Sequence, residues 1–255
     1  MLIALALRKK ISNTTGLLLV GLAMTLYADT APADSTASLL IGTGWNADSV
    51  VRYSTSTDTD LTFDDVAWDT DPFGTPPYYA FRVTHWFDRA PGWGWALDFT
   101  HAKMISEQDR LTRVSGLRDG MRVDGIERVG DTFQELEFSD GHNIVTLNAL
   151  RRWQPFATDT VSPLRNAALY AGGGLGIAVP HVEVRTVDNL THEYQYAGPA
   201  LQLMTGAGMP LGDRWSLQVE YRLTWAELKT ELNGGGELST DALTHHVNFG
   251  IGFDF

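Results

Sequence analysis

The chain has 255 residues, of which 44% are hydrophobic and 20% are charged, and it contains no cysteine. This length allows one sizeable domain or two small ones, and the lack of thiols excludes disulfides and a thiolate nucleophile. The net charge of −12 excludes nucleic acid as an expected partner, because phosphate binding needs clustered Lys and Arg.

The N-terminus has the organisation of a secretory signal. The basic stretch Arg8–Lys10 precedes the apolar run "GLLLVGLAMTLY" and the small-residue stretch "ADTAPADS". With the A-x-A site at Ala31–Ala33, this pattern predicts a signal peptide over residues 1–33, cleaved after Ala33. A membrane anchor is the alternative, but the run is shorter than the ~20 residues that a spanning helix needs. Residues 34–255 then form the mature domain.

The mature chain alternates with period two, which predicts β-strands. The pattern is clearest in "SLQVEYRLTWAE", where Leu217 and Tyr221 face one side and Glu220 and Arg222 face the other. The C-terminal "LTHHVNFGIGFDF" alternates in the same way and ends in Phe, which resembles the C-terminal signature of bacterial outer-membrane proteins. In chain order, eight strands are predicted at 38–46, 78–87, 94–103, 142–153, 167–184, 197–209, 216–227 and 243–255.

Short and long connections alternate between these strands. The short ones are "DRAPG", "QPFATDTVSPLRN" and "LGDR", and the longer ones lie near 55–77, 105–141, 185–193 and 231–243. This predicts an all-β fold: an eight-stranded antiparallel transmembrane β-barrel of the bacterial outer membrane, with short periplasmic turns and long external loops. A lipocalin-like soluble barrel is the alternative, but it would place charged residues outside rather than inside.

The outward rows of three adjacent strands become polar at the same height, near the external loops. Such a rim marks where the bilayer ends, or it forms a site that acts on a lipid head group. Histidine exchanges protons near neutral pH, and a His/Glu pair can hold a divalent cation. Pro180 lacks an N–H, so it should interrupt the ladder or lie at a bulge. The residues of this rim are His101, Lys103, Asn143, His181 and Glu183.

The two longest external loops are charged. The first contains six Asp in "DTDLTFDDVAWDTD", which favours either loose binding of divalent cations or a solvated acidic loop. The second has arginines, among them Arg110 and Arg113, that suit the phosphates and carboxylates of lipopolysaccharide. Pairing with the acids of the same loop, such as Asp124 and Glu127, is the alternative. No HExxH or GxSxG motif supports a zinc peptidase or serine hydrolase.

Five segments carry a family resemblance: "GWALDFTHAKM", "DGHNIVTLNALRRW", "GGGLGIAVPHVEV", "YQYAGPALQ" and "VEYRLTW". They resemble the small outer-membrane barrels identified as lipid A oxidase in rhizobia-like bacteria. The resemblance covers residues 94–255 and leaves out the first strand and the first loop. It implies oxidation of the proximal glucosamine of lipid A to an aminogluconate, with molecular oxygen and a divalent cation such as Mg²⁺. It brings no catalytic residues with it.

Two hypotheses follow. The first is an outer-membrane enzyme, a lipid A oxidase, whose site lies on the outward rim. The second is a non-catalytic barrel that stabilises the envelope or interacts at the cell surface. Both expect a monomer whose partners are outer-membrane lipid and lipopolysaccharide. For the enzyme, strand geometry gives His101, His181 and Glu183 as catalytic residues and metal ligands, and Lys103, Asn143, Arg110 and Arg113 as substrate-binding residues.

Overall fold

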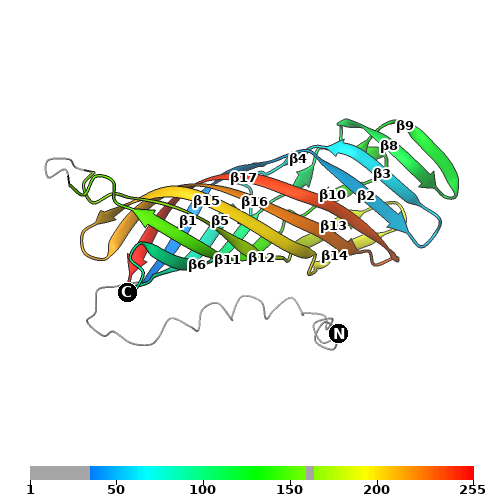
Figure 1. Ribbon diagram of the computed structural model, residues 1–255. Helices are drawn as coiled ribbons and strands as arrows, with labels where there is room; N and C mark the ends of the chain where they lie inside the picture. Colours follow the sequence, from blue (N-terminus) through cyan, green and yellow to red (C-terminus); the bar gives the residue numbers. More distant parts are fainter. Residues whose placement is uncertain (1–34, 159–163) are drawn as a thin grey trace, which may run out of the picture. The chain divides into compact units, whose positions relative to one another are not determined.

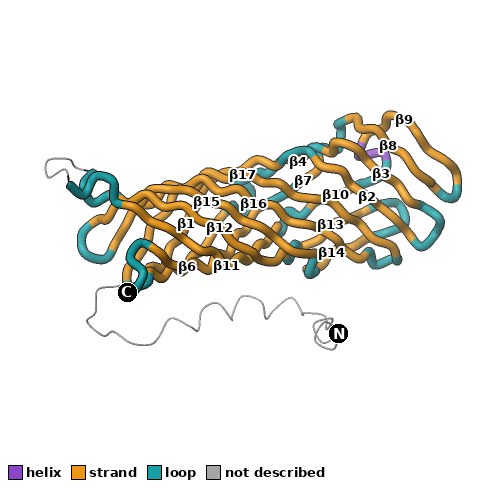
Figure 2. Tube along the Cα trace, in the orientation of Figure 1, coloured by secondary structure: helices purple, strands orange, loops and turns teal. Residues whose placement is uncertain are grey.

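The computed structural model describes residues 35–158 and 164–255. These residues contain seventeen β-strands and one short 3-10 helix, η1 (Val129–Asp131) (Figure 1). Strand covers most of the described chain (Figure 2). The predicted signal peptide, residues 1–33, lies outside the described residues. Within the two described ranges, no helix is long and apolar enough to cross a membrane.

Eight strands follow one another in an antiparallel ring. Each pairs with the next, and β17 also pairs back with β1, from Thr36↔Asp254 to Asn46↔Thr244. Each of the eight predicted strands overlaps one ring strand, so the all-β antiparallel architecture is confirmed. The ring strands are β1 (Ser35–Asn46), β5 (Tyr79–Trp86), β6 (Trp93–Ala102), β11 (His142–Trp153), β12 (Ala168–Ala178), β15 (Gly198–Leu211), β16 (Trp215–Glu231) and β17 (Gly236–Asp254).

The predicted count of eight strands is wrong for the described chain, because the connections expected to be loops hold further strands. Four of these extend the ring sheet beyond β17, in the order β2 (Ser49–Thr55), β3 (Asp60–Val66), β8 (Leu111–Arg118) and β9 (Met121–Arg128). The other five form a second sheet in the order β14 (Leu190–Tyr194), β13 (His181–Arg185), β10 (Glu135–Glu137), β7 (Ile105–Ser106) and β4 (Trp68–Asp69).

The segment 167–184, predicted as one strand, is interrupted at Pro180 as expected. The ring strand β12 ends at Ala178, and β13 begins at His181 in the second sheet. The predicted loop at 231–243 is mostly strand, so that prediction is wrong. It is strand because β17 continues beyond the ring, where Leu238 is fully buried in a hydrophobic core. Only residues 232–235 connect β16 to β17.

Polar residues fill the inside of the ring and apolar residues cover its outside. Glu220 is 1% exposed and Arg222 is 0% exposed, whereas Leu217 and Phe249 are 46% and 60% exposed. This is the reverse of a water-soluble barrel, and it confirms the two faces expected from the sequence. Arg82 and Arg222 pair inside the ring with the carboxylates of Asp98 and Glu220.

The strands outside the ring have their own hydrophobic core. Phe63 of β3, Phe133, Leu136 of β10, and Val182 and Val184 of β13 are all essentially unexposed and belong to one cluster. Because successive side chains of a strand point to opposite faces, burial of Val182 and Val184 turns His181 and Glu183 to the other face of β13. The strands of the long connections therefore pack around this core, and β13 carries His181 and Glu183 on the face turned away from it, the outer face of the second sheet.

Candidate metal centre

Four side chains of the second sheet and an adjoining loop converge on its outer face. They are Asp140, His181, Glu183 and His192, and one possible ligand atom from each lies within 4.8 Å of all the others. His181 and Glu183 are alternate residues of β13, while His192 is the register partner of Glu183 on β14. Asp140 precedes β11, next to the point where the His181 N–H donates a 2.8 Å hydrogen bond to the Gly141 carbonyl.

Glu183 is the centre of the cluster. Its Oε1 lies 3.0 Å from His181 Nδ1, and its Oε2 lies 3.4 Å from His192 Nε2. The Nδ1 of His181 is also 3.8 Å from an Asp140 carboxylate oxygen. A single carboxylate thus spans the two imidazoles, and the side chain that holds it is only 6% exposed.

Hydrogen bonds keep the Glu183 carboxylate ionised. Ser139 Oγ donates to Oε1 at 3.1 Å, and the Asp140 backbone N–H donates to the same oxygen at 2.9 Å. Burial alone would raise the pKa of Glu183, but the bonds from His181, Asp140 and Ser139 outweigh it and lower the pKa to about 2. Glu183 is therefore an anion at neutral pH.

Aromatic packing fixes the two imidazoles. The ring of His181 lies edge-on to His192 with centroids 4.5 Å apart, and its centroid is 4.6 Å from that of Tyr194. The Tyr194 hydroxyl donates a 3.1 Å hydrogen bond to the Asp140 carbonyl. Burial raises the pKa of Tyr194, so the phenol stays protonated as a donor. This contact ties the loop that bears Asp140 to β14.

The donor set fits a divalent transition metal. Imidazole nitrogens suit Fe²⁺, Zn²⁺, Ni²⁺ and Cu²⁺, and two His with one carboxylate form the facial triad of non-haem iron oxygenases. Mg²⁺ prefers oxygen ligands in octahedral geometry, so two imidazoles suit it poorly. The residues able to bind the metal are His181, His192 and Glu183, with Asp140 as a fourth, solvent-exposed ligand.

The other predicted ligand, His101, belongs to a separate contact at the end of β6. Its Nδ1 donates to Asn143 Oδ1 at 2.9 Å, and its ring stacks on Tyr79 with centroids 4.7 Å apart. His101 and Asn143 are register partners of β6 and β11. The structure thus brings His181 and Glu183 together, as the prediction places them. His101, predicted as a third ligand beside them, instead contacts Asn143 and lies outside the four-residue cluster.

The predicted substrate-binding bases already have acidic partners. Lys103 is buried, with its Nζ 3.4 Å from an Asp71 oxygen. Arg110 lies 2.5 Å from Asp48, and Arg113 lies 3.0 Å from Asp124. For the arginine-rich loop, the alternative to lipopolysaccharide binding was pairing with acids of the same loop. Arg113 shows this pairing, because its partner Asp124 belongs to that loop.

Two members of the cluster, Asp140 and His192, escape the sequence analysis. His192 falls in a segment expected to be a loop, although "HVEVRTVDNLTHEY" alternates on both sides of the turn residues Val187 and Asp188. Reading that segment as a hairpin would have placed His192 opposite Glu183. Asp140 has no comparable signal. It lies beside His181 because the loop that precedes β11 packs against β13, and alternation along a single strand does not show which loop packs there.

No protein-family model and no curated protein matches this chain. Several solved structures are similar in part. Neisserial surface protein A (NspA) is 11% identical, with a TM-score of 0.42, over 88% of this chain and 98% of its own. OprG, an outer membrane protein from Pseudomonas aeruginosa, is 13% identical, with a TM-score of 0.43, over 88% of this chain and 98% of its own.

Ail, the attachment invasion locus protein of Yersinia pestis, was solved in complex with the heparin analogue sucrose octasulfate. It is 10% identical, with a TM-score of 0.30, over 84% of this chain and 99% of its own. By their names, NspA is a surface protein and OprG is an outer membrane protein.

Proposed function

We propose that the ring spans the bacterial outer membrane as a β-barrel, and that the Asp140–His181–Glu183–His192 cluster is a metal-dependent site that oxidises lipid A from the outer leaflet. The supporting observation for the site is the convergence of two imidazoles and two carboxylates within 4.8 Å. Two imidazoles and one carboxylate are the protein ligands of non-haem iron oxygenases, and this cluster offers that set.

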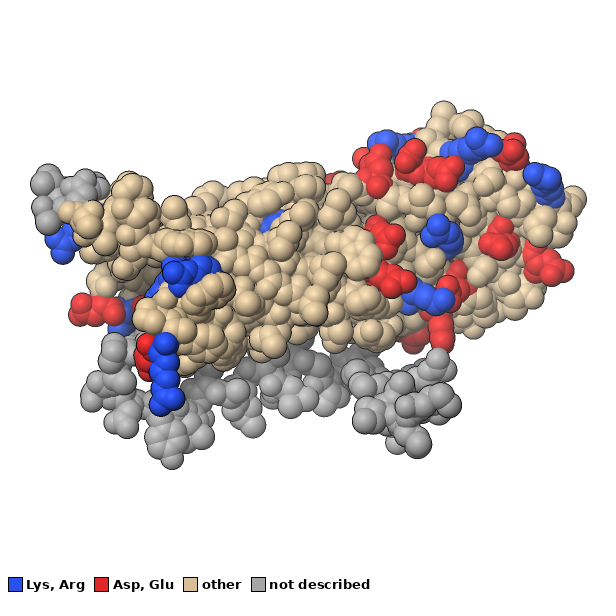
Figure 3. All heavy atoms as spheres, in the orientation of Figure 1, with Lys and Arg blue, Asp and Glu red and all other residues tan. Residues whose placement is uncertain are grey.

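The surface of the ring supports the membrane part of the proposal. On the face drawn in Figure 3, a band almost free of Lys, Arg, Asp and Glu separates the charged extension from the opposite end. Apolar side chains such as Leu147, Leu203 and Phe249 are about 60% exposed to the outside of the ring. In hydrocarbon, every backbone group must be paired within the protein, and a ring without an edge meets that requirement.

The site lies just beyond the end of β12, in line with the outward-facing side chains of that strand. Leu175 and Ile177 of that row are 69% and 42% exposed. His181 lies three residues beyond the end of β12 at Ala178, which places it about 10 Å farther out at ~3.3 Å per residue. A site at this height and on this side meets the head groups of the outer leaflet. A lipid substrate can reach it sideways, without entering the ring.

The proposed reaction is the oxidation of a sugar hemiacetal. The C1–H and C1–OH hydrogens of the proximal glucosamine leave with two electrons, O₂ takes them up to become hydrogen peroxide, and C1 becomes a lactone. Water then opens the lactone to the aminogluconate, so the product gains one oxygen atom. A bound transition metal would supply the redox chemistry toward O₂.

The residues of this chain provide the rest. Glu183 and the two histidines would hold the metal, with Ser139 keeping the carboxylate in place. Asp140 and His192 are the exposed members of the cluster, at 54% and 51%. A substrate can reach the Asp140 carboxylate, which, when it is not bound to the metal, would accept the proton of the C1 hydroxyl. Tyr194 would hold the Asp140 backbone while this proton moves.

Mass spectrometry of lipid A tests the proposal. The protein is expressed aerobically in a bacterium whose lipid A carries a free C1 hydroxyl, with Fe²⁺ in the medium. We expect a lipid A species that has gained one oxygen atom when the wild-type protein is expressed. This species should be absent when His181→Ala or His192→Ala is expressed instead. His245→Ala is the matched control, because this histidine also faces outward on the ring but binds Tyr221 instead of the cluster. Unchanged lipid A from the folded wild-type protein would favour the non-catalytic barrel.

A further inference from the structure

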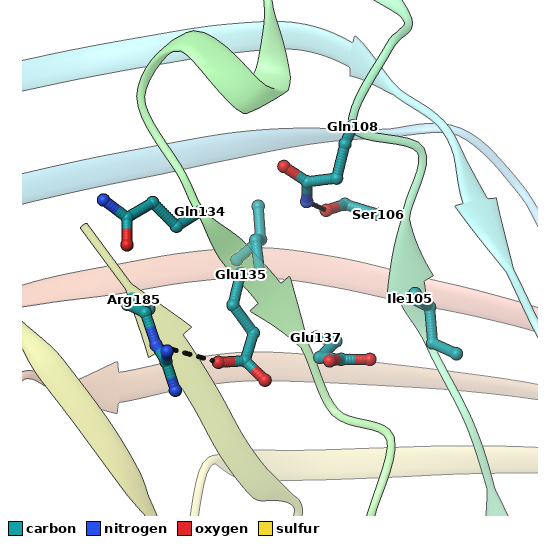
Figure 4. A pocket seen from close by; sticks show the side chains of 8 residues that line it. Ile105, Ser106, Gln108, Gln134, Glu135, Glu137 and Arg185 are labelled. Atoms are coloured by element: carbon teal, nitrogen blue, oxygen red, sulfur yellow. Dashed lines mark hydrogen bonds and ion pairs between the residues drawn. The ribbon is translucent and has the colours of Figure 1, made fainter. Parts of the chain in front are cut away.

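A pocket lies beside the metal cluster on the same sheet. It has a volume of about 240 Å³ and is lined by residues of β7, β10 and β13 and the segments next to them (Figure 4). Side chains of Ser106, Gln108, Gln134 and Glu137 border it, and the ion pair between Arg185 and Glu135, 3.3 Å long, forms one side. Drug-sized ligands fill about 300–1,000 Å³, so this volume suits a smaller ligand such as one sugar ring.

Strand register connects the pocket to the cluster. Glu137 of the pocket is the register partner of Glu183, and Glu135 is the partner of Arg185. Since β13 runs outward from His181 to Arg185, the pocket lies up to about 13 Å farther from the ring than His181. A head group whose reacting sugar is at the cluster would extend its next sugar in this direction.

The pocket offers hydrogen bonds to uncharged groups. The Gln134 amide can donate and accept, and the Gln108 amide oxygen can accept, which suits ring hydroxyls and an acylated amine. The Gln108 amide nitrogen already donates to the hydroxyl of the buried Ser106 at 2.7 Å (Figure 4). The Gln134 amide makes no hydrogen bond to the other side chains drawn in Figure 4. Two carboxylates against one guanidinium leave the pocket net negative, and Glu135 already occupies Arg185, so phosphates and acidic sugars are disfavoured.

We propose that this pocket is the binding site for an uncharged hexosamine, the second sugar of the glycolipid on which the metal cluster acts. The substrate class rests on the proposed function, whereas binding of a sugar does not. Gln134 and Gln108 are the specificity-determining residues, and they hold the sugar ring while Glu135 and Glu137 exclude anionic head groups.

Binding without turnover tests the pocket. Purified protein in detergent micelles is titrated with N,N′-diacetylchitobiose, a neutral disaccharide, and separately with glucosamine 6-phosphate and glucuronic acid. We expect saturable binding of the neutral disaccharide alone. Gln134→Ala should weaken it by about three- to tenfold, the value of one neutral hydrogen bond. Gln134 is exposed, so its loss should not disturb folding, and the exposed Gln154 at the opposite end supplies the matched control, Gln154→Ala.

The outcomes separate this proposal from that for the metal site. His181→Ala should abolish oxidation but keep disaccharide binding, and Gln134→Ala should raise KM for the glycolipid with kcat nearly unchanged. Binding of the disaccharide by a protein that never alters lipid A would retain the pocket and reject the oxidase. Equal binding by wild type and Gln134→Ala, or a preference for either anion, would overturn the pocket.

Discussion

His181 Nδ1 lies 3.0 Å from Glu183 Oε1, two residues along the same strand and on the same face. That spacing follows from the β-strand alone, because alternate side chains share a face. Of the other two members, His192 comes from the neighbouring strand of the hairpin and Asp140 comes from a loop. The cluster therefore combines one local relationship with two that depend on tertiary structure.

Loss of the Ser139 hydroxyl should weaken the metal site without removing a ligand. Groups that orient metal ligands typically contribute 10- to 100-fold in affinity. Ser139→Ala should therefore raise the Kd for Fe²⁺ or Zn²⁺ by about tenfold or more, measured by competition with a fluorescent chelator. Ser115→Ala, on β8 and outside the cluster, is the control and should bind like wild type. Equal affinities in all three proteins would show that Ser139 does not position Glu183.

The metal-free protein should lose local stability in acid through Glu183. The pKa of this group in the folded protein, about 2, lies below its ordinary value of 4.5, so its ionised form stabilises the fold. That contribution is complete above about pH 4.5 and disappears as the pH falls toward 2. Hydrogen exchange of the β13 and β14 amides, corrected for intrinsic rates, should show protection in wild type that declines over this window.

Glu183→Gln should lack this pH dependence, because the amide does not titrate. The two proteins should then differ most at neutral pH and converge near pH 2. A difference that is constant from pH 6 to pH 2.5 would contradict the role assigned to the ionised carboxylate.

Glu220→Gln should destabilise the ring strongly. Inside the ring, two guanidiniums face two carboxylates, and Glu220 contacts both Arg82 and Arg222. Removing one carboxylate leaves an uncompensated buried positive charge, which typically costs about 3–5 kcal/mol. Urea unfolding in detergent micelles, followed by tryptophan fluorescence, measures the loss.

Glu237→Gln is the matched control for Glu220→Gln. Glu237 pairs with Lys229 at 2.8 Å, but both side chains are more than a third exposed, and such pairs contribute about 0–1 kcal/mol. Similar unfolding midpoints for the two variants would show that the pairing inside the ring does not set the stability.

The ring could be predicted from the sequence because its strands have two chemically different faces. In β16, Leu217 and Tyr221 are exposed while Glu220 and Arg222 are buried, and that alternation is visible in the letters alone. The second sheet gives a weaker signal, because its strands are short and its polar face looks like a loop. Burial of Leu136 between Glu135 and Glu137 is what makes β10 a strand, and only tertiary packing shows it.

The hairpin of β8 and β9 had a signal that the sequence analysis did not use. Asp119 and Gly120 join the two strands with φ values of 52° and 75°, and Asp-Gly is a favoured pair for such two-residue turns. For the candidate site, outward parity was sufficient to place His181 and Glu183 on one face of their strand. It could not show that Asp140 would join them, because parity along one strand does not fix which loop lies beside it.

Gly174→Ala should impair folding of the ring. A Cβ at this position would clash with the Leu147 carbonyl oxygen and lie 2.6 Å from the Asn148 Cα, both backbone atoms of the paired strand β11. Neither atom can move without disturbing the ladder, and overpacking of this kind costs about 1–3 kcal/mol. Gly208→Ala on β15 is the control, because its nearest contact would be 3.8 Å away. The folded fraction, read from the mobility of unheated protein on SDS gels, should fall for Gly174→Ala and stay at the wild-type level for Gly208→Ala. Equal folded fractions would mean that β12 can move away from β11 at this position, and that the glycine is not required by their close approach.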